Sequence, residues 1–275
     1  MPLKLKSYYL EEYNPELAPL ITLLMCYRYS GDAELDIIPF FRSFIFHIPR
    51  EDWDKFEFII KVDTDDIEGF TAVHLLRQLY RKLCIRIVKY DRWSGRANLY
   101  LNYALMFSKR NTSSKFIGFV TGDSVFVRNF LPDLLKHEDT HFIFSSELDN
   151  NVLEYAGKYR VNHHWAGGGL TELFPIVTCN IIEICGGMGW QSNIDNWLSL
   201  LNVVCYHKHG VMLYRKTAEP YIKLTGLKTE FKPIDTSFND DMYVSVSQKP
   251  KNQYYFDLVE QQAKNIVLNI KYGRY

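Results

Sequence analysis

The alternation of short apolar runs with amphipathic stretches in the first half of the chain constrains the fold most. Apolar runs that we interpret as strands occupy 19–26, 56–62, 84–88 and 116–120. Segments with helical spacing of apolar residues fall between them, at 35–48, 72–83 and 96–108. Strands joined by helices in this way pair in parallel through right-handed crossovers. We therefore expect an α/β fold with a mostly parallel, twisted sheet flanked by helices, as in Rossmann-like proteins.

Polar clusters follow three of the predicted strands. They occupy residues 27–32, 63–66 and 121–124. In an open parallel sheet the ligand binds outside the carboxyl ends of the strands. The pattern therefore predicts that these three clusters gather at one edge of the sheet and form the ligand site.

The second half of the chain is less regular. Residues 140–145 and 181–184 have strand character, and apolar residues between 194 and 205 recur at helical spacing. Residues 149–172 are polar and glycine-rich, which predicts a long loop. An amphipathic stripe over 256–275 predicts a final helix that packs on the body of the protein.

Charge, cysteine count and hydropathy exclude several classes of protein. Lys+Arg and Asp+Glu both number 32, so the chain lacks the basic surface of a dedicated nucleic-acid binder. Five scattered cysteines without a CxxC pair argue against a zinc site or a disulfide framework. The sequence contains no secretory signal and no apolar run of about 18 residues. We therefore expect a cytoplasmic protein without a transmembrane segment.

Three segments, in this order and spacing, carry a resemblance to a known family. They are IIKVDTDD at 59–66, GRANLYLNYALMFS at 95–108 and KFIGFVTGDSVFVRNFLPDLL at 115–135. Over residues 20–136 the chain resembles GT-A-type glycosyltransferases, close to the large family 2 group. The resemblance implies an enzyme that moves a sugar from a nucleotide-diphosphate-sugar donor to an acceptor hydroxyl, with inversion at the anomeric carbon.

The resemblance also implies a division of the chain. We expect a single GT-A-like domain over residues 1–275. Residues 20–145 would bind the nucleotide-sugar, residues 146–255 would form the acceptor side, and 256–275 would be the C-terminal helix. The acceptor would be a glycan, a lipid or a protein.

One departure from the family concerns the metal. The usual DxD motif reads Thr121-Gly122-Asp123 here. In the family the last carboxylate anchors a divalent cation, and Asp123 matches that position. Thr121 can hydrogen-bond ribose but is a poor metal ligand. The implied cofactor is Mn²⁺ or Mg²⁺, held by Asp123, diphosphate and water. Whether a cation or an arginine neutralises the diphosphate stays open.

Three acids follow the second predicted strand. Asp63, Asp65 and Asp66 lie within four residues, where their mutual repulsion calls for nearby cations or donors. The resemblance implies contacts to the base and ribose of the donor. The simpler alternative is a solvated turn at a helix N-terminus, where acids are favoured.

Four further residues are candidate donor contacts. Arg96 and Asn98 begin the helix over 96–108, where an arginine can donate two hydrogen bonds to a phosphate. Tyr27 and Arg28 follow the first strand and can stack on a base or hold phosphate. The alternative is that these side chains are ordinary surface residues.

The candidate general base is Asp195, in SNIDNWLSLL. The resemblance implies an acid there that deprotonates the acceptor hydroxyl. Asp240 and Asp241 are rivals, and a helix-capping acid is the structural alternative. The resemblance also implies that a late histidine completes the cation shell, which makes His207 and His209 candidate ligands.

His163, His164 and Trp165 lie in the glycine-flanked loop and suit binding to the face of an acceptor sugar. Two other functions stay open. A nucleotidyltransferase would carry a glycine-rich phosphate loop after the first strand, but CYRYSGDAELD has one glycine there. A noncatalytic sugar- or nucleotide-binding protein would also be consistent with an altered DxD motif.

Overall fold

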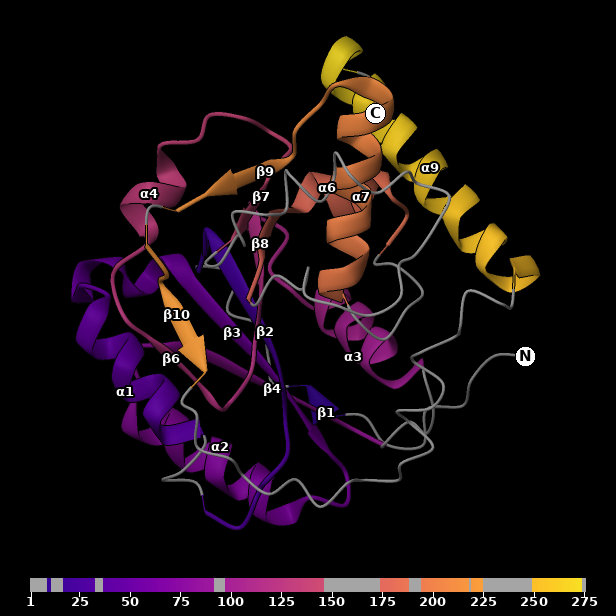
Figure 1. The fold of residues 1–275 in the computed structure, drawn as a ribbon. Helices are drawn as coiled ribbons and strands as arrows, with labels where there is room; N and C mark the ends of the chain where they lie inside the picture. Colours follow the sequence, from indigo (N-terminus) through magenta and orange to yellow (C-terminus); the bar gives the residue numbers. More distant parts are fainter. Residues whose placement is uncertain are drawn as a thin grey trace.

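A computed structural model describes residues 9–10, 17–32, 37–91, 97–145, 174–187, 194–217, 219–224 and 249–273. Its main sheet has eight strands in the order β1-β4-β3-β2-β5-β8-β7-β9 (Figure 1). The strands are β1 (Tyr9–Leu10), β2 (Ile21–Tyr27), β3 (Phe56–Asp63), β4 (Cys84–Tyr90), β5 (Phe116–Val120), β7 (Ile143–Ser145), β8 (Ile176–Thr178) and β9 (Tyr214–Lys216). A second sheet pairs β6 (Ser124–Phe126) with β10 (Ile222–Leu224).

Helices connect and cover the strands. They are α1 (Ile37–His47), the 3-10 helix η1 (Arg50–Lys55), α2 (Ile67–Leu79), α3 (Ala97–Ser108), α4 (Leu131–Leu135), α6 (Cys179–Ile184), α7 (Ile194–His209) and α9 (Lys249–Tyr272). Within the described parts of the chain, no helix is both long enough and apolar enough to cross a membrane.

The centre of the sheet is parallel. Strand β2 pairs in parallel with both β3 and β5, and β3 pairs in parallel with β4. Strand β8 runs antiparallel between β5 and β7, while β1 adds an antiparallel edge. The predicted mostly parallel α/β sheet is therefore confirmed.

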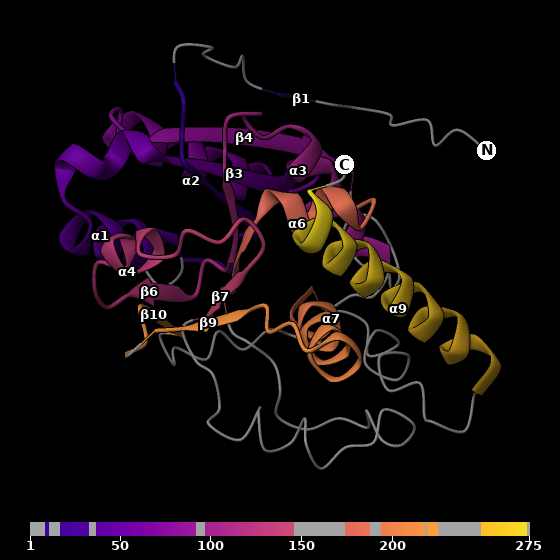
Figure 2. The same ribbon diagram turned by 90° about the horizontal axis from the view of Figure 1, so that it is seen from above.

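Two apolar cores lie on the two faces of the sheet. On one face, Phe40, Phe41 and Phe44 of α1 pack against Phe58 of β3, with ring centroids 5.0–6.1 Å apart. On the other, α7 and α9 bury residues such as Trp197. Figure 2 shows α1 and α4 on one side of the sheet and α7 and α9 on the other. Strands buried on both faces explain the continuous apolar runs in the sequence.

Residues 181–184 form a helix, so the strand predicted there is wrong. They belong to α6, and the strand in this region is β8, which ends at Thr178. Ile181 and Ile182 are buried, whereas Glu183 faces Arg110, with which it forms an ion pair. Four residues are too few to show a helical or a strand period, so such a run does not distinguish a buried helical turn from a strand.

The helix expected over 72–83 is found as α2, but it runs from Ile67 to Leu79 and its predicted apolar face is only partly buried. Leu76 is buried, whereas Leu75 and Leu79 are 53% and 72% exposed. The buried face of α2 consists of Gly69, Val73 and Leu76. At the other end of the chain, the predicted C-terminal helix is confirmed and begins earlier, at Lys249.

Candidate functional site

The ends of β2, β3 and β5 meet at one edge of the sheet, as the polar clusters predicted. The backbone N–H of Tyr29, after β2, donates to Asp66 Oδ2, after β3, at 2.9 Å. Gly122, after β5, lies so close to Tyr27 that an added Cβ would sit 3.4 Å from the ring Cδ2. The three clusters therefore form one continuous surface at the carboxyl end of the sheet.

Asp63 is neutralised by two cations. The buried Lys61 Nζ forms an ion pair with Asp63 Oδ1, and Arg28 Nη1 lies 3.8 Å from Asp63 Oδ2. Lys61 Nζ also lies 4.8 Å from the ring centroid of Tyr90, whose hydroxyl donates to Asn102 Oδ1 of α3 at 2.5 Å. Lys61 was absent from our sequence-based candidates, although a lysine inside an apolar strand two residues before an acid was a visible signal.

Asp66 has a structural role. Its Oδ1 accepts a hydrogen bond from Gly69 N at 2.9 Å, which caps α2, and its Oδ2 accepts the Tyr29 N–H. Both carboxylate oxygens are thus engaged by the backbone. Asp65, in contrast, is exposed, and its carboxylate has no partner among the described residues. Of the three acids after β3, Asp65 is the one available to a ligand.

Gly69 is required for this arrangement, because a Cβ added there would lie 2.2 Å from Asp66 Oδ2. We expect Gly69→Ala to displace the Asp66 carboxylate and to lower the free energy of unfolding by about 1–2 kcal/mol through the lost cap. Urea unfolding followed by circular dichroism measures the change. The Asp66→Ala variant should show a similar loss, and the double variant should lose much less than the sum. Additive losses would show that Gly69 acts independently of the cap.

The Thr121-Gly122-Asp123 segment forms a turn between β5 and β6. The carbonyl of Thr121 accepts hydrogen bonds from Ser124 N at 3.3 Å and Ser124 Oγ at 2.6 Å. This turn leaves Thr121 exposed and Asp123 half-buried. The described residues offer the Asp123 carboxylate no hydrogen bond or ion pair, so it is available to a ligand.

Tyr27 lies beneath the site. Its ring is 4% exposed and belongs to the apolar core under Gly122, which leaves no free face to stack on a base. The neighbouring Cys26 is not a candidate nucleophile, because burial raises the pKa of its thiol to about 12. Tyr27 thus supports the floor of the site.

The strand registers and Figure 1 together orient α7 relative to the sheet. Through β8 and β7, Tyr214 at the start of β9 is level with Ile117 near the start of β5. The last turn of α7 leads into β9, and Asn202 Oδ1, in the middle of α7, accepts from Tyr214 N at 3.2 Å. Figure 1 shows α7 running away from the start of β9, so its N-terminal end, where Asp195 is the second residue, is the end farther from that point.

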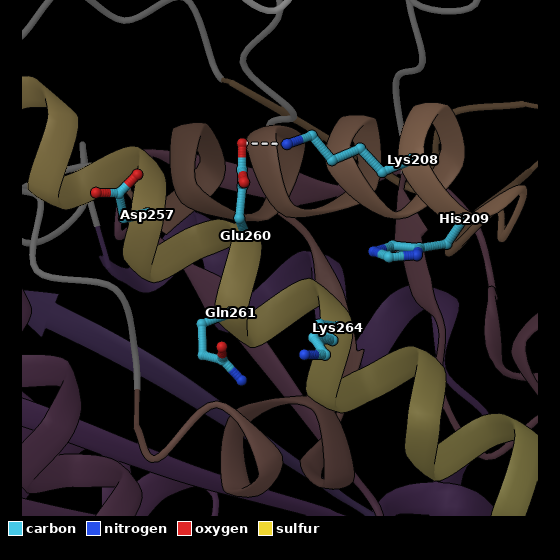
Figure 3. Close-up of a pocket in the computed structure, with 6 residues that line it drawn as sticks. All are labelled: Lys208, His209, Asp257, Glu260, Gln261 and Lys264. Carbon is cyan, nitrogen blue, oxygen red and sulfur yellow. Dashed lines mark ion pairs between the residues drawn. The ribbon is translucent and has the colours of Figure 1, made fainter.

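His207 and His209 lie in the last turn of α7, the end of the helix that leads into β9 (Figure 1). This turn borders a pocket of about 250 Å³ between α7 and α9 (Figure 3), lined by Lys208, His209, Asp257, Glu260, Gln261 and Lys264. Lys208 is ion-paired with Glu260 there. The described residues contain no group of three side chains spaced to hold a metal. The role of His207 and His209 as cation ligands stays a prediction.

Several candidates fall outside what the structure describes. Arg96 precedes the described part of α3, and Asn98 is placed only by the backbone of its first turn. The acceptor candidates and the two rival bases also lie outside the described residues, namely His163, His164, Trp165, Asp240 and Asp241. These assignments stay predictions.

Comparison with known proteins identifies the fold. No protein-family model matches the chain, and no curated protein matches it. Among solved structures, residues 1–349 of S. aureus TarS in complex with UDP give a TM-score of 0.51 at 11% identity, over 74% of this chain and 59% of that one. The chain thus spans less than two thirds of that TarS structure.

The mannosyltransferase PcManGT from Pyrobaculum calidifontis, in complex with GDP-Man and Mn²⁺, is a second structural neighbour. It gives a TM-score of 0.51 at 15% identity, over 95% of this chain and 78% of that one. At these identities the likeness shows the fold alone. The chain therefore has the GT-A-type glycosyltransferase fold that the sequence resemblance implied.

Proposed function

We propose that this protein is a glycosyltransferase that moves a sugar from a nucleotide-diphosphate-sugar to an acceptor hydroxyl. The observation that carries the proposal is the meeting of three strand ends in a GT-A fold, with Asp65 and Asp123 both free at that edge. The structural neighbours hold UDP or GDP-Man. The segment after β2 contains one glycine, which disfavours the nucleotidyltransferase alternative.

The residues at this edge fit a hard divalent cation. Such ions prefer carboxylate oxygens, diphosphate and water, and the unpartnered Asp123 carboxylate supplies the first of these. We infer that Asp123 holds Mn²⁺ or Mg²⁺, while Thr121 and Asp65 contact the ribose or base. When bound, the cation would neutralise charge on the departing diphosphate. PcManGT holds Mn²⁺, which is consistent with this assignment.

A binding and turnover experiment tests the proposal. We expect at least one of UDP, GDP, ADP and CDP to raise the melting temperature in the presence of Mn²⁺, since a ligand at 100 times its Kd adds about 2.7 kcal/mol of stability. The corresponding nucleotide-sugar should then be hydrolysed or transferred. Binding without turnover of any sugar donor would favour the noncatalytic alternative. No stabilisation by any of the four nucleotides would refute the proposal.

We propose Asp195 as the general base for the acceptor hydroxyl, because it lies in the first turn of α7, at the end of the helix away from the start of β9 (Figure 1), which is level with the start of β5. We expect Asp195→Asn to lower kcat by about 10²-fold or more, the usual size of a general-base contribution. The Kd of the donor nucleotide should hardly change, since the base acts on the acceptor.

The rival bases Asp240 and Asp241 provide the comparison. If Asp240→Asn or Asp241→Asn abolishes turnover while Asp195→Asn stays active, the base is assigned to the wrong residue. NMR of the product should show an inverted anomeric centre. Retention of the donor's configuration would exclude a single displacement.

A further inference from the structure

Arg28, Lys61 and Asp63 form a group of two cations around one carboxylate at the ends of β2 and β3. Lys61 Nζ binds Asp63 Oδ1, and Arg28 Nη1 lies 3.8 Å from Asp63 Oδ2. One cation is enough to neutralise one carboxylate. These three side chains together therefore have a formal charge of +1, so one of the two cations is available to an anionic ligand at the proposed donor site.

The two cations are held very differently. The Lys61 side chain is 4% exposed, lies over the ring of Tyr90 and forms a close ion pair with Asp63. Moving it away would break a buried ion pair and leave the buried ammonium without its carboxylate, which is strongly unfavourable. The Arg28 side chain is 42% exposed, and 3.8 Å is too long for a hydrogen bond. Arg28 can leave Asp63 at little cost, because an exposed ion pair contributes little.

We propose that Arg28 exchanges Asp63 for the diphosphate of the donor, and that Lys61 is the positioning residue that permits this exchange. The buried ammonium of Lys61 keeps Asp63 neutralised when Arg28 departs. An arginine can then donate two parallel hydrogen bonds to phosphate oxygens. This inference rests on the proposed function and adds to it a residue outside the ligand contacts.

The exchange predicts an unusual effect of removing a residue that does not contact the ligand. In the Lys61→Met variant, Arg28 is the one cation of this group that remains beside the buried Asp63 carboxylate. Asp63 then holds Arg28 away from the diphosphate. The affinity for a nucleoside diphosphate should fall, while the affinity for the nucleoside alone should not. Removing the carboxylate as well, in Lys61→Met/Asp63→Asn, should release Arg28 and restore the affinity for the diphosphate.

The test compares UDP with uridine and GDP with guanosine, at one Mn²⁺ concentration, by calorimetric titration of the diphosphates and NMR titration of the nucleosides. The readout is the ratio of diphosphate to nucleoside affinity. We expect Arg28→Gln and Lys61→Met each to lower this ratio about tenfold, or about 1.4 kcal/mol. The Arg28→Gln/Lys61→Met double variant should match Arg28→Gln alone. Arg50→Gln, an exposed arginine in η1, serves as the matched control and should leave the ratio unchanged.

The outcomes separate this inference from the proposed function. If the wild-type protein binds neither UDP nor GDP, the proposed function and this inference both fail for those nucleotides. If it binds one of them but Arg28→Gln leaves the ratio unchanged, the exchange is wrong and the proposed function stands. An equal loss of nucleoside and diphosphate affinity in Lys61→Met would show a purely structural lysine. If Lys61→Met fails to fold, the affinity ratios of Arg28→Gln and Lys61→Met/Asp63→Asn still test the exchange.

Discussion

Replacing Asp123 by alanine should lower kcat/KM by at least about 10³-fold, at the upper end of what loss of one electrostatic contact to a transition state costs. The departing diphosphate develops charge that needs a counter-charge, and Asp123 is the carboxylate proposed to hold the cation that supplies it. The affinity for the nucleoside diphosphate should also fall in Mn²⁺ or Mg²⁺. Steady-state kinetics and titration with and without the cation measure both effects.

The fold should survive this substitution. Asp123 makes no hydrogen bond or ion pair with the described residues, so its removal leaves no buried group unpaired. The matched control is Glu138→Gln, an exposed carboxylate that precedes β7 at the opposite edge of the sheet. It should retain full activity. Wild-type activity and cation response in Asp123→Ala would show that Asp123 is structural.

Replacing Arg86 by methionine should lower the free energy of unfolding by about 3–5 kcal/mol, a large part of the total stability of a typical domain. Arg86 Nη1 donates to Glu57 Oε1 at 2.6 Å and to the carbonyl of Lys109 at 2.6 Å. The other oxygen of Glu57 accepts from Thr22 Oγ1 at 2.6 Å and from Asn111 N at 3.0 Å. Without Arg86, the carboxylate of Glu57, which is 1% exposed, loses the cation that neutralises it.

Urea unfolding measures this loss, and a second change tests its cause. Glu57→Gln added to Arg86→Met removes the unpaired charge while keeping an oxygen to accept from Asn111 N. The double variant should therefore recover much of the stability. Lys136→Met breaks an exposed ion pair with Asp133 and should cost at most about 1 kcal/mol. Equal losses in Lys136→Met and Arg86→Met would refute a special role for the buried pair.

The sequence predicted the class of fold and the edge that carries the site. Strands β2, β3 and β5 appear in the sequence as apolar runs because both of their faces are buried. Helices α1 to α3 appear between the strands as segments whose apolar residues recur at helical spacing. These are local signals, and parallel pairing follows from the connections alone. The meeting of residues 27–32, 63–66 and 121–124 follows in turn, because parallel strands end at one edge.

The tertiary structure decided what each polar residue does. Asp63, Asp65 and Asp66 are alike in sequence, yet one is ion-paired to Lys61, one is exposed, and one caps α2 and binds Tyr29 N. Lys61 and Gly69 are near neighbours in sequence of the acids they contact, whereas Tyr29 and Arg28 reach Asp66 and Asp63 because β2 pairs in parallel with β3. Periodicity reports which face of an element is buried, whereas the contacts of Tyr29 with Asp66 and of Arg28 with Asp63 join residues far apart in the chain.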